Sequence, residues 1–175
     1  MSEKIIYSPS VIEFITVAVE YCALVEKLQG VSRRKFLGQI TKMLPLIYVK
    51  AALLPEIEEG EGLALPEVVT EDDYDYVRRG IWSLLGQHDD YLDVFTADMQ
   101  FSEAPITCSI SEDLADIYQD LKNFVAIYAD RNELLMADAI AQVSENFRTY
   151  WGQKLVNAMR PLHEITYTQT EDEED

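Results

Sequence analysis

The sequence predicts an all-α protein built as a bundle of about five helices. Two observations lead to this prediction. Apolar residues recur at spacings of three and four along several long segments, which is the pattern of one buried helical face. No segment has the composition and alternation of a convincing strand. Because each apolar stripe must be buried against another element, we expect the helices to pack into a bundle.

The first two helices are predicted from their boundary residues as well as from their apolar faces. The first is expected to begin at Ser8 or Ser10, which suit an N-cap, and to stop at Gly30. The second is expected to begin after Ser32. Pro45 falls inside the apolar pattern of this second helix. Since proline has no backbone N–H to donate, we expect a kink or a break there.

An acidic loop separates the second helix from the third. Residues 56–69 contain five glutamates with two glycines and a proline, which is typical of a connecting loop. Thr70 and Asp73 then have the spacing of a helix cap, and the third helix is expected to run to about Leu85. Residues 87–110 show no clean period, so we expect an irregular segment there, with a short helical turn followed by extended chain.

The last two helices complete the predicted domain. Ser111 is the expected cap of the fourth helix. The final helix is expected over about residues 132–162, with Gly152 inside it, where another helix could approach closely. These elements predict a single helical domain over residues 1–167. Residues 168–175 are rich in acids and are expected to form a disordered acidic tail.

The charge of the chain is strongly negative and unevenly distributed. The net charge is −18, and residues 56–121, with eighteen acidic and two basic residues, contribute −16. Such a field repels phosphate groups, so direct binding to nucleic acid and docking to an anionic membrane are not expected. The same field favours a basic protein partner or metal cations. Acidity also keeps a protein soluble, and that explanation requires no partner.

Motifs for cofactor binding and nucleophilic catalysis are absent from the sequence. Two cysteines without a CxxC spacing, together with only two histidines, exclude a zinc site of the finger type. Neither a phosphate-binding glycine loop nor a GxSxG motif occurs. The first residues have no basic start followed by a long apolar run, so neither a signal peptide nor a membrane span is expected. We predict a cytoplasmic protein without a cofactor, and a divalent metal ion stays open.

Four stretches of the chain carry a resemblance to a known family. They are FITVAVEYCALVE at 14–26, LLGQHDDYLDVF at 84–95, EDLADIYQDLKNFV at 112–125 and NFRTYWGQKLVNAMRPLH at 146–163. Together they resemble small helical bacterial proteins of domain of unknown function family 5063. The resemblance covers most of the chain apart from the acidic tail. It implies a helical fold and a bacterial cytoplasmic setting, and it implies no activity or catalytic residues.

A first group of candidate residues could hold a metal ion. His88, Asp89 and Asp93 lie within the sequence HDDYLD, and a histidine with nearby carboxylates can bind Mn²⁺, Fe²⁺ or Zn²⁺. Asp113 and Asp116 are further candidate ligands, because all-helical magnesium enzymes present carboxylates from several helices. The alternative for the first three residues is an acidic helix cap or a solvated turn.

A second group of candidate residues could bind a partner. Asp113, Asp116 and Asp120 are spaced at i, i+3 and i+7, so they share one stripe of the fourth helix. The alternative is the solvated face of an amphipathic helix.

Late in the final helix, three further residues are candidates for partner binding. Lys154 and Arg160 could line a groove, and Trp151 next to them is a residue type that often anchors interfaces. The alternative is that Trp151 packs in the core between solvated neighbours.

The sequence leaves the function unknown, and we consider three hypotheses, beginning with the one that we prefer. The first is a non-enzymatic interaction protein that binds a basic partner through its acidic middle third, residues 56–76 and 88–121. The second is a metal-dependent hydrolase built in a helical bundle. The third is an acidic mimic of nucleic acid, although no phosphate-like spacing of the acids is visible. The oligomeric state and the identity of the partner do not follow from the sequence.

Overall fold

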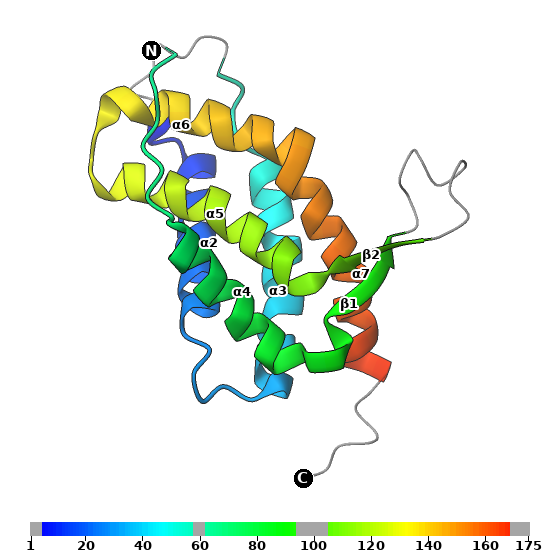
Figure 1. The fold of residues 1–175 in the computed structure, drawn as a ribbon. Helices are drawn as coiled ribbons and strands as arrows, with labels where there is room; N and C mark the ends of the chain where they lie inside the picture. Colours follow the sequence, from blue (N-terminus) through cyan, green and yellow to red (C-terminus); the bar gives the residue numbers. More distant parts are fainter. Residues whose placement is uncertain (1–4, 58–61, 94–104, 169–175) are drawn as a thin grey trace.

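The computed structural model describes residues 5–57, 62–93 and 105–168, and these form a helical bundle (Figure 1). The predicted all-α fold is confirmed. Five long helical segments make up the described bundle, and a π-helical turn divides the last of them. They are α2 (Pro9–Glu26), α3 (Arg33–Ala52), α4 (Glu71–Leu85), α5 (Ile110–Ala129), and α6 (Glu133–Asn146), which continues through the π turn Phe147–Trp151 into α7 (Gly152–Thr168).

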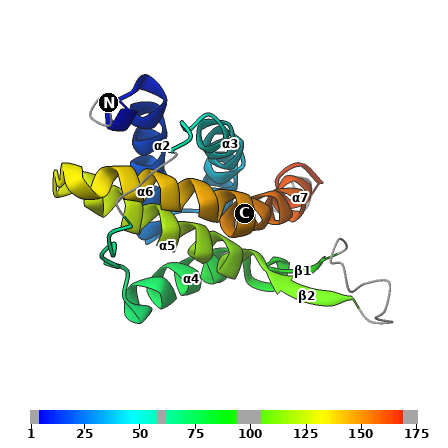
Figure 2. The same cartoon turned by 90° about the horizontal axis from the view of Figure 1, so that it is seen from above.

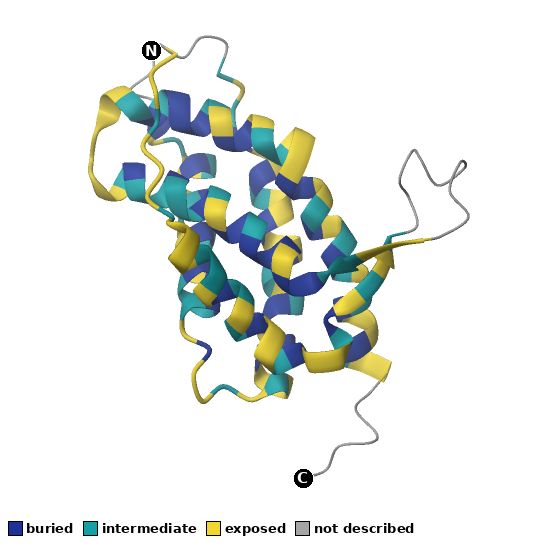
Figure 3. Ribbon diagram, in the orientation of Figure 1, coloured by how far each residue is buried: buried dark blue, intermediate teal, exposed yellow. Residues whose placement is uncertain are grey.

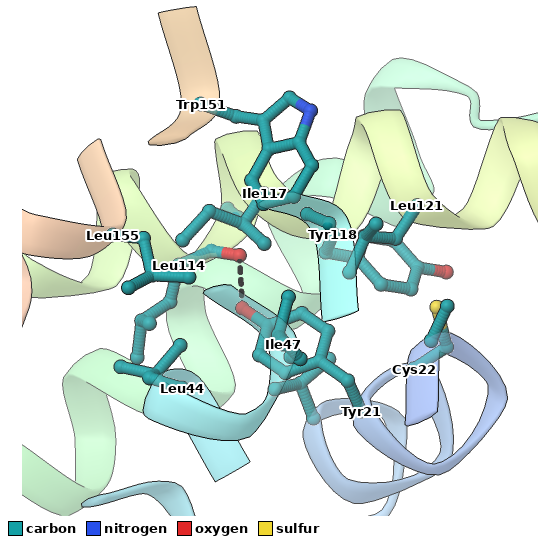
Figure 4. Packing of buried hydrophobic residues seen from close by; sticks show 14 of the residues in the cluster. Tyr21, Cys22, Leu44, Ile47, Leu114, Ile117, Tyr118, Leu121, Trp151 and Leu155 are labelled. Atoms are coloured by element: carbon teal, nitrogen blue, oxygen red, sulfur yellow. Dashed lines mark hydrogen bonds between the residues drawn. The ribbon is translucent and has the colours of Figure 1, made fainter. Parts of the chain in front are cut away.

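Helix α5 is the centre of the bundle. It packs against α2, α4, α6 and α7, while α3 contacts α2 and α7 (Figure 2). The buried residues, dark blue on the ribbon of Figure 3, occur along each of these helices, and their apolar side chains form one core. Within this core the Tyr21 hydroxyl donates to the carbonyl of Leu114 at 2.7 Å (Figure 4). This hydrogen bond satisfies the polar end of a fully buried ring and fixes α2 against α5.

None of the described helices has the length and apolar character needed to cross a bilayer. Residues 169–175 of the predicted acidic tail lie outside the described residues.

Local capping sets the start of two helices, as predicted. The Ser32 hydroxyl accepts a hydrogen bond from the backbone N–H of Lys35 at 3.2 Å. At the start of α4, the Thr70 hydroxyl accepts from the N–H of Asp73, and the Asp73 carboxylate accepts from the N–H of Thr70 at 2.9 Å. This capping box satisfies two backbone donors that have no partner within the helix.

Pro45 does not break α3. The helix runs from Arg33 to Ala52 without interruption, so of the predicted kink or break the break is wrong, and the kink stays a prediction. Leu44 and Ile47, on either side of the proline, are fully buried. Their burial holds both halves of the helix against the bundle and outweighs the hydrogen bond that the proline removes.

A short hairpin occupies part of the segment that was expected to be irregular. After a 3₁₀ turn at Gly86–His88, β1 (Asp90–Asp93) pairs antiparallel with β2 (Ile106–Ser109), with Tyr91 opposite Cys108. The predicted helical turn and extended chain are confirmed, but the pairing was not predicted. Each strand has four residues and its partner is distant in sequence, so neither produces a visible local period. The hairpin extends from the bundle at the start of α5 (Figures 1 and 2).

The predicted last helix is not uniform. A π turn at Phe147–Trp151 separates α6 from α7. A Cβ atom added to Gly152 would stand 2.2 Å from the carbonyl oxygen of Phe147. The glycine therefore makes room for the backbone and ring of Phe147 in its own chain. π turns are rare and occur frequently at functional sites.

Candidate functional site

The three aspartates of the predicted stripe lie inside the bundle. The side chains of Asp113 and Asp116 are 4% and 13% exposed, and Asp120 is half-buried. Asp113 and Asp116 face α7 and not solvent, so the alternative of a solvated helical face is wrong for these two residues. Buried carboxylates require compensating charges or hydrogen bonds, because removing an ion from water is costly.

Lys154 of α7 provides the compensating charge. Its ammonium nitrogen lies 3.3 Å from Asp113 Oδ1 and 3.0 Å from Asp116 Oδ2. Burial acts to lower the pKa of Lys154, but the hydrogen bonds and charges of the two aspartates outweigh it and raise that pKa above its usual range. Burial raises the pKa of Asp113, and Lys154 offsets only part of this effect. The lysine is therefore a cation at neutral pH, shared between two carboxylates.

Three tyrosines complete the shell around these carboxylates. The Tyr91 hydroxyl donates to Asp113, and the Tyr74 hydroxyl donates to Asp116 Oδ1 at 2.9 Å. Burial and, next, hydrogen bonding to Asp116 raise the pKa of Tyr150 to about 12. These phenols therefore keep their protons at neutral pH and act as hydrogen-bond donors. The arrangement places two carboxyl groups and one lysine cation at the junction of α4, α5, α7 and the hairpin.

Asp89 has a structural role at the start of α5. It is 2% exposed, and its carboxylate accepts from the N–H of Ser111 at 2.7 Å. The hydroxyls of Ser109 and Ser111 also donate to it, at 2.6 and 2.7 Å. Helix α5 begins at Ile110, so the prediction that Ser111 is its N-cap is wrong. Asp89, which lies before β1, supplies the hydrogen-bond acceptor for the first turn of the helix. This agrees with the helix-cap alternative for HDDYLD.

The predicted metal ligands do not gather into a metal site. Among residues 5–57, 62–93 and 105–168, no group of three or more His, Cys, Asp or Glu side chains could hold a metal ion. His88 lines a surface groove and Asp93 ends β1, whereas Asp89 serves α5. Asp113 and Asp116 share the lysine cation instead.

A groove of about 450 Å³ lies next to the buried charges, between α5, α6 and the loop before α4. Asp120 is in its wall, and the Asn146 amide donates to Asp120 Oδ1 at 2.5 Å. Burial raises the pKa of Asp120, and the hydrogen bond from Asn146 opposes this shift. The volume is in the range of small-ligand sites. The remaining lining residues are Ala64, Leu65, Pro66, Glu67, Gln119, Asn123, Phe124, Ile127, Ala139, Gln142, Val143 and Tyr150.

Two side chains fix the loop that covers one side of this groove. Asp138 of α6 accepts from the N–H groups of Gly62 and Leu63, at 3.1 and 3.3 Å. Asn123 Oδ1 of α5 accepts from the N–H groups of Val68 and Val69, at 2.8 and 3.0 Å. Residues 62–69 are thus anchored at both ends, and the groove is formed before any ligand arrives.

The family of the chain follows from comparison with known sequences. A model of the family described as domain of unknown function DUF5063 matches residues 5–168. The chain belongs to the DUF5063 family. The resemblance seen in four stretches of the sequence is confirmed, and it brings no assigned activity.

One solved structure resembles this DUF5063 chain closely. It is the crystal structure of protein BF1032 from Bacteroides fragilis, with 41% sequence identity and a TM-score of 0.82. The match covers 94% of this chain and 96% of that one. No curated protein matches the chain. The comparisons therefore establish family and fold and leave the function open.

The predicted partner-binding residues of α7 do not form one surface. Trp151 is fully buried and donates its indole N–H to the carbonyl of Val143 at 3.1 Å, so it is a core residue (Figure 4). Lys154 is held by the α5 aspartates. Arg160 is exposed and lines a different groove with His88. In this DUF5063 chain, the proposed anchor Trp151 therefore has no surface to offer a partner.

Residues that the sequence did not single out contribute most of the groove. Gln119 and Asn123 are four apart on α5, and Gln142 and Asn146 are four apart on α6. Each pair shares a helical face. Pairs of amide residues at this spacing on two consecutive helices could have been recognised in the sequence as a candidate polar site. Tyr150, which lines the groove with these amides, lies in the π turn. No local sequence pattern predicts this turn, so the position of Tyr150 could not be predicted.

Proposed function

We propose that this protein is a non-enzymatic interaction protein of the cytoplasm that binds a basic protein partner. The surface is an acidic strip along α5, made of the exposed Glu112, the half-buried Asp120 and the neighbouring Glu67, with the lysine-paired Asp116 between them. The three α5 residues follow one another at intervals of four, so they lie on adjacent turns of one face. Glu67 lines the same groove as Asp120.

The observation that carries this proposal is the lack of compensating charge at the two ends of the strip. Among the described residues, no ion pair involves Glu112, Glu67 or Asp120, and Lys154 serves only the inner part. Glu112 and Glu67 are exposed. Such a strip attracts a basic surface and speeds its association. Asp113, which the sequence includes among partner-binding residues, is buried and drops out of this surface.

Two further observations agree with a cytoplasmic interaction protein. Cys22 and Cys108 are both free thiols, which is usual in a reducing compartment. The described residues offer no group of metal ligands and therefore no support for the hydrolase alternative.

The proposal is tested with a short arginine-rich peptide as a basic probe. The variant Glu67→Gln with Glu112→Gln neutralises two exposed acids of the strip. The matched control Glu20→Gln with Glu164→Gln neutralises two exposed acids elsewhere and changes the net charge equally. Because exposed charge pairs contribute roughly 0.2–1 kcal/mol each, the strip variant should bind the peptide roughly 2- to 30-fold more weakly.

Isothermal titration calorimetry at low and at physiological ionic strength measures this difference. The strip variant should also lose most of the salt dependence of binding, since the removed charges are those that salt screens. Equal weakening by the control pair would show that the peptide responds to net charge alone, and the strip would then not be the binding surface.

A further inference from the structure

The groove beside Asp120 has the chemistry of a cation socket. Its fourteen lining residues include two acids, Glu67 and Asp120, and no lysine, arginine or histidine. Its deeper wall is apolar, with Phe124, Ile127 and Val143 all at most 3% exposed. A ligand that fits must therefore combine a positive head with an apolar stem.

One carboxylate oxygen of Asp120 is available to such a head. Oδ1 accepts from Asn146, whereas Oδ2 accepts no hydrogen bond from the described residues. The one buried side-chain oxygen or nitrogen without a partner in the described chain is Ser144 Oγ, so Asp120 Oδ2 is not a buried unpaired atom, and Asp120 itself lines the groove. Asn146 uses its NH₂ group on Asp120, which leaves its carbonyl oxygen as a further acceptor.

The groove around Asp120 offers more hydrogen-bond acceptors than the three N–H donors of an ammonium group can use. Besides Oδ2 and the Asn146 oxygen, the groove is lined by the amides of Gln119 and Gln142 and by the phenol of Tyr150. An ammonium group has three donors, whereas a guanidinium group has five in a planar fork that matches carboxylates. A multi-acceptor wall therefore favours guanidinium.

We infer that this groove is a socket for an alkyl-guanidinium group, with Asp120 as its anionic anchor and the α5–α6 amides as additional acceptors. The inference rests on the proposed function in one respect, since an arginine side chain of the basic partner is one source of that group. A free small guanidinium compound is the other source. The anchored loop 62–69 makes the socket preformed, so binding requires little ordering of the protein.

The experiment compares agmatine with 1,4-diaminobutane, which has the same four-carbon stem and carries ammonium in place of guanidinium. Titration calorimetry is performed on the wild-type protein, on Asp120→Asn and on the control Asp130→Asn, which neutralises an exposed aspartate outside the groove. Wild type and Asp130→Asn should bind agmatine alike and more tightly than the diamine. Asp120→Asn should lose roughly 10- to 100-fold in affinity, because a hydrogen bond to a charged group is removed.

Loss of fold does not explain such a result. Burial raises the pKa of Asp120, so its carboxylate is less stable in the folded protein than in the unfolded chain, and an asparagine of the same shape, which keeps an Oδ1 acceptor for Asn146, should not lower the melting temperature at pH 7. Equal agmatine binding by Asp120→Asn and Asp130→Asn overturns the socket, as does absence of any guanidinium binding by the wild type.

The two proposals fail separately. If Glu112→Gln alone weakens binding of the arginine-rich peptide but agmatine does not bind and Asp120→Asn has no effect, the acidic strip stands and the socket is wrong. If agmatine binds through Asp120 while the peptide ignores the strip, the socket stands with a free small ligand and the proposed partner is wrong.

Discussion

Lys154 is the residue on which the buried charges of α5 depend. Replacing it by methionine keeps the length of the side chain and leaves Asp113 and Asp116 without a cation. Breaking a fully buried pair costs about 3–5 kcal/mol, and since the Lys154 side chain is 32% exposed we expect about 2–3 kcal/mol. Urea unfolding at pH 7 measures this loss against Lys42→Met, which removes an exposed lysine without a described ion pair.

The loss of stability caused by Lys154→Met should become smaller as the pH is lowered. Burial already raises the pKa of Asp113 in the folded state, and removal of Lys154 raises it further. A carboxyl whose folded pKa is raised destabilises the fold above that pKa, and the penalty disappears as pH falls towards the unfolded value near 4. The gap between Lys154→Met and wild type should therefore shrink on acidification. A gap that stays constant with pH would mean that Lys154 acts by packing alone.

At the scale of the helix, the π turn between α6 and α7 depends on Gly152. In Gly152→Ala the new methyl group would meet the carbonyl oxygen of Phe147 at 2.2 Å, so the turn must change. Overpacking of this kind costs roughly 1–3 kcal/mol, which corresponds to a fall in melting temperature of about 2–12 °C for a domain of this size. Because Tyr150 lies in this turn and lines the socket, agmatine binding should weaken with it.

Gly38 provides the matched control. It lies inside α3, and a Cβ atom there has no other atom within 4 Å. Gly38→Ala should raise stability by roughly 0.4–1 kcal/mol, since alanine restricts the unfolded chain and favours the helix. Equal tolerance of both substitutions in thermal unfolding would contradict a π turn held by Gly152.

The same scale explains which elements were predictable. Thr70 and Asp73 form a cap within four residues, so the start of α4 could be predicted from local spacing alone. The pairing of Tyr91 with Cys108 joins distant residues, and no local pattern encodes it. Helical spacing places the α5 aspartates on one stripe, but only the arrival of Lys154 from α7 makes that stripe an interior one.

On the scale of the whole molecule, the effect of the negative charge depends on which acidic residues are buried and which are exposed. The net charge is −18, yet two of its most conspicuous aspartates are buried and compensated. The exposed acids are therefore those that a partner can meet. The acidic composition favours a basic partner, and because Asp113 is buried our proposal assigns the contact to the ends of the α5 strip.

The whole-molecule charge also decides how divalent cations should act. A built metal site at 100 times its dissociation constant adds about 2.7 kcal/mol, or roughly 5–10 °C in melting temperature for this size. The described residues have no group of three metal ligands, and Lys154 already pairs with both Asp113 and Asp116. At fixed ionic strength we therefore expect Mg²⁺, Mn²⁺, Ca²⁺ and Zn²⁺ to give small and similar shifts by general screening. A large shift with one ion at micromolar concentration, abolished by EDTA, would instead restore the metal-dependent hydrolase and make nucleotide hydrolysis the next assay.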